Sequence, residues 1–103
     1  MFVVEVFVPL AHSDGKRIAP EVFDGIKSEL TERFGGVTAF LRAPAEGQWK
    51  PHRARPVISD QVAIFEVMVR DVDTRWWGRY RRRLERDLGQ EQVLVRLHQV
   101  TLL

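Results

Sequence analysis

Residues 61–70 read Gln-Val-Ala-Ile-Phe-Glu-Val-Met-Val-Arg and predict a β-strand that is rich in apolar residues on both faces. The odd-numbered positions from 63 to 69 are all apolar. The even-numbered positions mix valine, isoleucine and methionine with Glu66 and Arg70. One fully apolar face and one mixed face are expected for a strand inside a sheet that is covered on one side. We therefore expect this strand near the middle of a sheet whose helices all lie on one face.

Three further strands are predicted around it. Residues 2–8 are β-branched or aromatic except for Glu5, and Pro9 closes that run because proline cannot donate a hydrogen bond to a neighbouring strand. Residues 37–42 predict a short second strand, and residues 93–103 alternate in the manner of a last strand.

Two helices are predicted from apolar residues spaced three and four apart. The first covers about residues 20–34, with Pro20 in its first turn and Gly35 beyond its end. The second covers residues 74–88, with Asp73 or Thr74 as its cap and Gly89 as its stop. Its apolar stripe consists of Trp77, Tyr80, Leu84 and Leu88.

The order of these elements is β-α-β-β-α-β, and this split βαβ connectivity predicts an α+β, ferredoxin-like fold. We expect an antiparallel four-stranded sheet in the order 4-1-3-2 with both helices on one face. A chain of 103 residues leaves room for one domain, so residues 1–103 are expected to form a single ferredoxin-like domain.

Composition excludes several classes of protein. The chain has no cysteine, which removes disulfide frameworks, zinc fingers and cysteine nucleophiles. Its three histidines have no recognised ligand spacing, so we expect neither a metal nor a cofactor. The apolar runs are too short for a signal segment or a membrane span, and the expected location is the cytoplasm.

The sheet face away from the helices is the main candidate site. Glu5 and Glu66 fall on the two central strands, and Arg96 and His98 fall on the neighbouring edge strand. About half of the other residues on this face are apolar, which predicts that something covers it.

Two interpretations of this face stay open. It could be a ligand pocket in which Glu66 and His98 handle protons while Glu5, Arg70 and Arg96 orient the ligand. Alternatively, the charges could pair across strands around an apolar dimer interface.

The long loop at 43–60 carries a second set of candidate residues. Its length favours a functional segment or an interface arm. Trp49 within it is either an anchor that fixes the loop to the domain or a lid over a ligand. A different site could combine Trp49 with Thr38, Gln90 and Glu91, although amides and carboxylates at such positions often cap backbone groups.

The second helix has a net charge of +4, because it carries six arginines against Glu85 and Asp87. Such a helix can bind nucleic acid or an acidic protein. Spacings of four residues from Arg81 to Glu85 and from Arg83 to Asp87 instead favour local neutralisation and a solvated face. The sheet also lacks the aromatic run of an RNA-binding sheet, so a nucleic-acid partner is the less favoured alternative.

Three motifs resemble a group of small bacterial proteins of unknown function. They are Phe-Gly-Gly-Val-Thr at 34–38, Gly-Gln-Trp at 47–49 and Gly-Gln-Glu-Gln-Val at 89–93. That group in turn resembles the dimeric α+β barrel proteins, a ferredoxin-like superfamily that includes small monooxygenases and stress-responsive proteins. The resemblance implies the fold and a homodimer, and it implies no catalytic residue.

Together these observations predict a homodimer that binds or turns over a small organic ligand on the open sheet face, without a permanent cofactor. Whether the protein is an enzyme stays open. The alternative is a non-catalytic module that binds nucleic acid or an acidic protein through helix 74–88.

Overall fold

Six elements follow one another in the computed structural model, which describes residues 1–12, 14–42 and 62–103. They are β1 (Phe2–Pro9), α1 (Pro20–Phe34), β2 (Thr38–Arg42), β3 (Val62–Val69), α2 (Thr74–Leu88) and β4 (Leu94–Gln99). The predicted β-α-β-β-α-β order is confirmed. The long loop with Trp49 lies outside the described residues.

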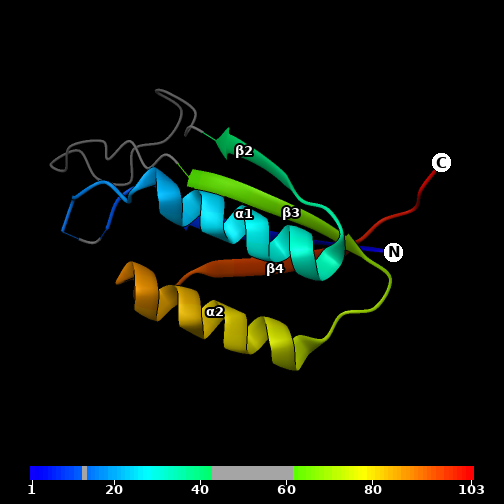
Figure 1. Cartoon of the computed structure of the whole chain (residues 1–103). Coiled ribbons are helices and arrows are strands. Elements are labelled where there is room, and N and C mark those ends of the chain that lie inside the picture. Colours follow the sequence, from blue (N-terminus) through cyan, green and yellow to red (C-terminus); the bar gives the residue numbers. More distant parts are fainter. Residues whose placement is uncertain (13, 43–61) are drawn as a thin grey trace, which may run out of the picture.

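The four strands form one antiparallel sheet in the order β2-β3-β1-β4. Counted from the β4 edge, this is the order 4-1-3-2. Both helices lie on the same side of the sheet and run in opposite directions (Figure 1). The α+β fold of the ferredoxin-like type is therefore confirmed, and no helix of residues 1–12, 14–42 or 62–103 lies on the other sheet face.

The core lies between the sheet and the helices. Alternate residues of the two central strands face it, Val4, Val6 and Val8 from β1 and Ala63, Phe65 and Val67 from β3. The helices cover them with buried residues, mainly Ile26 and Leu30 from α1 and Trp77, Tyr80, Leu84 and Leu88 from α2. Burying each large apolar side chain stabilises the fold by about 1.5–3 kcal/mol before entropy is counted.

Local signals set the helix ends where the sequence predicted them. Asp73 caps α2, and its carboxylate accepts a hydrogen bond of 3.1 Å from the backbone N–H of Trp76. Gly89 ends α2 with φ at 63°, and Gly35 ends α1 with φ at 85°. Both glycines occupy the left-handed region, where a side chain would be strained.

Two expectations about these elements are wrong. The last strand ends at Gln99 rather than at residue 103, because its neighbour β1 begins at Phe2. Beyond Gln99 the backbone N–H of Val100 still donates a hydrogen bond of 2.9 Å to the carbonyl of Met1. Arg83 does not pair with Asp87 along α2. It bonds instead to Glu29 of α1, which raises the pKa of Arg83 and ties the two helices together.

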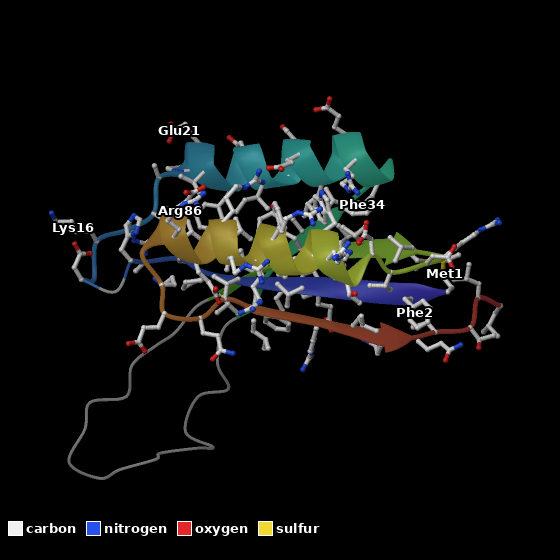
Figure 2. The ribbon with its side chains drawn as sticks, turned by 90° about the horizontal axis from the view of Figure 1, so that it is seen from below. Met1, Phe2, Lys16, Glu21, Phe34 and Arg86 are labelled. Atoms are coloured by element: carbon white, nitrogen blue, oxygen red, sulfur yellow. The ribbon has the colours of Figure 1, made fainter. Side chains whose placement is uncertain are left out.

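Aromatic side chains fill the contact between the helices. The ring of Phe34 at the end of α1 stacks on Trp77 with 5.1 Å between centroids and meets Trp76 edge-on at 5.2 Å. Trp76 stacks in turn on Tyr80 at 4.9 Å. Phe34 is labelled in Figure 2, where it lies on the side of α1 that faces α2. Trp76 therefore packs against aromatic residues of its own chain.

Tyr80 is buried in this cluster, and its hydroxyl has no hydrogen-bond partner among the residues that the structure describes. Burial, assisted by the nearby Glu29 carboxylate, raises the pKa of Tyr80 well above its ordinary value of 10.0. The folded protein therefore keeps this proton at pH values where the unfolded chain has lost it. Stability is unaffected below pH 10 and falls as the pH rises above it.

We expect Tyr80→Phe to be neutral or stabilising at pH 7, because it removes a buried hydroxyl that lacks a partner. Above pH 10 the wild type should lose up to about 1.4 kcal/mol of unfolding free energy per pH unit more than the variant. Urea unfolding of both proteins across this range measures the difference. Equal losses in the two proteins would show that Tyr80 does not titrate in this way.

Candidate functional site

The open sheet face is organised in rows that run across the four strands. The strand registers align Thr38, Glu66, Glu5 and Arg96 in one polar row. The next row is entirely apolar and consists of Phe40, Ile64, Phe7 and Leu94. On the other side of the polar row, Met68, Val3 and His98 form a mixed row. The predicted alternation of the strands therefore places the candidate charges on one surface.

Glu5 is the buried member of the polar row, with 7% of the residue exposed. Its Oε1 accepts a hydrogen bond of 3.0 Å from Nε of Arg96, and Nδ1 of His98 lies 3.6 Å from the same oxygen. The guanidinium of Arg96 also sits 4.8 Å from the ring centre of Phe7. Arg96 and His98 therefore approach Glu5 from a single strand, β4.

Glu66 lies on the other side of Glu5, directly opposite it in the β1–β3 register. It is half-buried, and in the described part of the chain no hydrogen bond or ion pair reaches its carboxylate. Like charges opposite each other on adjacent strands repel. Among the described residues the row is thus polarised, with a carboxylate that has no ion pair on β3 and the cationic side chain on β4.

An open pocket of about 470 Å³ adjoins Glu66. It lies where the connection from α1 to β2 passes the end of the sheet, and its lining residues are Val3, Phe34, Gly35, Gly36, Val37, Thr38, Glu66, Val67 and Met68. This volume falls within the usual range for small-molecule sites. The Glu66 carboxylate and the Thr38 hydroxyl supply hydrogen-bonding groups in an otherwise largely apolar wall.

One other predicted ligand-binding residue, Arg70, is not part of this row. Arg70 follows the last residue of β3 and is exposed, and no bond joins it to the row within the described ranges. Trp49 lies outside those ranges.

The alternative site built from Thr38 and Gln90 does not form. Thr38 opens β2 and faces Glu66, whereas Nε2 of Gln90 donates to the carbonyl of Ala11 at 3.1 Å. Ala11 lies beyond the far end of β1, about 20 Å away along the strand direction. Gln90 and His12, whose Nδ1 lies 2.8 Å from the carbonyl of Leu88, instead hold the end of α2 against the chain that follows β1.

Two residues of β2 were not assigned to this face from the sequence. Thr38 extends the polar row and Phe40 extends the apolar row. The exposed fractions of Phe40, Leu94 and Met68 are 42%, 47% and 49%. The alternation of residues 37–42 contained this signal, but the pairing of β2 with β3 was needed to place these side chains next to Glu66 and Ile64.

Residues 1–12, 14–42 and 62–103 contain neither a candidate metal-ligand group nor a membrane-spanning helix. No group of three histidine, cysteine or acidic side chains in these ranges could hold a metal ion. None of the helices found there is both long enough and apolar enough to cross a membrane.

No protein-family model and no curated protein matches this chain. Among solved structures, it is similar to a phage SAM lyase in complex with S-methyl-5'-thioadenosine, with a TM-score of 0.60 and 15% sequence identity. The similarity covers 95% of this chain and 80% of the lyase chain. At this identity it shows the fold alone. The motif resemblance to small bacterial proteins stays a prediction.

Arg96→Ala is expected to reduce the free energy of unfolding by about 1–2 kcal/mol, because it leaves the Glu5 carboxylate buried without its hydrogen bond. Arg70→Ala removes an exposed arginine without such a contact and should change stability by less than about 0.5 kcal/mol. Urea titrations measure both.

Adding Glu5→Gln to Arg96→Ala provides the matched control, because a neutral amide is less costly to bury than a charge. We expect the double variant to recover part of the lost stability. No recovery, or equal losses in Arg96→Ala and Arg70→Ala, would contradict the pairing.

Proposed function

We propose that this protein binds a small organic ligand at the edge of the sheet, in the pocket beside Glu66 and Thr38. The observation that carries this proposal is the position of Glu66. Its carboxylate borders a pocket of about 470 Å³, and the neighbouring Glu5, of the same charge, is already engaged by Arg96. The complex of the phage SAM lyase with a thioadenosine supports it by showing that a protein of this fold holds a small molecule.

The charge of the row favours a particular class of ligand. A carboxylate beside a second carboxylate is stabilised by a cation or by hydrogen-bond donors. We therefore expect a ligand with a positively charged group or several donors next to an apolar part that contacts Val3, Val37 and Met68. If the ligand reacts, Glu66 would accept a proton, while Arg96 would hold the Glu5 carboxylate in place through their hydrogen bond.

Ligand binding can be tested with S-methyl-5'-thioadenosine and a panel of small amines and nucleosides as probes. A probe at ten times its Kd stabilises the folded state by about 1.4 kcal/mol, which raises the melting temperature of a domain of this size by several degrees. We expect such a shift in the wild type and in Glu32→Gln, which removes an exposed carboxylate of α1. We expect it to be lost in Glu66→Gln.

Two results would overturn this assignment. One is a wild type that no member of the panel stabilises. The other is a Glu66→Gln variant whose shift equals that of Glu32→Gln.

We also propose that a second copy of the chain covers the open face. Phe40, Met68 and Leu94 are each more than two-fifths exposed on it, and an apolar surface of this kind marks an interface.

The wild type should then have twice the 12.0 kDa mass of the chain in sedimentation equilibrium. Leu94→Lys should shift it to the monomer, because it places a charge in the apolar row. Leu102→Lys changes another exposed leucine, outside the sheet, and should leave the dimer intact. A monomeric wild type, or equal dissociation of both variants, would exclude this interface.

A further inference from the structure

The six arginines of α2 fall into two groups. Arg81 pairs with Glu85 at 3.0 Å, and Arg83 pairs with Glu29 of α1. The other four are exposed and are called the arginine stripe here: Arg75, Arg79, Arg82 and Arg86. In the described residues, only Arg86 of these four has a carboxylate within ion-pair distance. That partner is its neighbour Asp87, at 3.5 Å with both side chains more than half exposed.

The arginine stripe lies on the side of α2 opposite the core. At 100° per residue, its four positions fall within about 60° of one another and are centred about 180° from the buried Trp77, Leu84 and Leu88. Along the axis the stripe extends for about 16 Å. Glu85 and Asp87 lie to its two sides, so no acidic residue of the helix lies within it.

This arrangement works against the stability of the isolated helix. Arg75 and Arg79, Arg79 and Arg82, and Arg82 and Arg86 are neighbours at spacings of three or four, where like charges repel. A polyanion would relieve this repulsion. The apolar face of α2 is already buried in the core, so the helix cannot insert that face into a membrane.

We propose that the arginine stripe binds the phosphate backbone of double-stranded nucleic acid. All basic residues of α2 are arginines, whose planar guanidinium groups bind phosphate through two parallel hydrogen bonds. A duplex presents one charge per about 1.7 Å of its axis, so a row of about 16 Å meets several phosphates. Protein surfaces usually carry both signs of charge close together. An acidic protein would therefore match a row of four arginines less well than a phosphate backbone does.

Ion pairs engage Arg81 and Arg83, and Asp87 approaches its neighbour Arg86. The four arginines of the stripe are all exposed and lie along one side of α2. The arginine stripe and the lining of the Glu66 pocket share no residue, so this proposal does not depend on the proposed ligand site.

Anisotropy of a fluorescent DNA duplex tests the proposal at two salt concentrations. With four phosphate contacts, the affinity of the wild type should fall about a hundredfold between about 50 and 200 mM salt. Arg79→Gln/Arg82→Gln should bind more weakly at low salt and lose only about tenfold over the same range. The control Arg17→Gln/Arg70→Gln removes two exposed arginines outside α2 and should keep the larger salt dependence.

Thermal unfolding of the same variants separates lost binding from lost folding. Arg79→Gln/Arg82→Gln should melt at a higher temperature than the wild type, because it removes like-charge neighbours. The proposal is overturned if the wild type does not bind the duplex at low salt or if the control loses as much affinity as the stripe variant. It is also overturned if poly-glutamate or phosphatidylserine vesicles bind the stripe more tightly than the duplex does.

Discussion

The buried carboxylate of Glu5 constrains the whole open face of the sheet. It lies on the central strand β1, where removing a charge from water is costly unless cations and hydrogen bonds compensate it. Arg96 supplies that compensation from β4, and Nδ1 of His98 on the same strand lies 3.6 Å from the same oxygen. On the β3 side, the register places Glu66, which has the same charge. The proposed preference of the Glu66 pocket for positive groups rests on this one-sided compensation.

The other side of the sheet obeys a simpler rule. Alternate valines of β1 and β3 must be covered, and the apolar stripes of α1 and α2 cover them. Each helix thereby commits one face to the core. The opposite face of α2 is exposed, and packing does not restrict which residues can occur there. Four arginines on a face that packing does not constrain therefore need an explanation in terms of function or solubility.

Local signals explain what the sequence could predict. Pro20, Gly35, Asp73 and Gly89 act within one helical turn, and the predicted helix bounds are those observed. Alternation within β1, β3 and β4 likewise places their side chains on the correct faces, since it depends only on neighbours along the strand. The polar row was predicted through these alternations together with the expected strand order.

What the sequence could not give depends on contacts between distant segments. Arg83 has an acidic neighbour four residues away, yet it bonds to Glu29, because the packing of α1 on α2 brings that carboxylate within reach. The pocket beside Glu66 similarly requires the turn after α1 to pass the end of β3. The net charge of +2 conceals this separation. Glu5 and Glu66 lie on the sheet face beside Arg96, whereas four exposed arginines lie together on the outer face of α2, so the positive charge is concentrated on the side of the domain away from the sheet face.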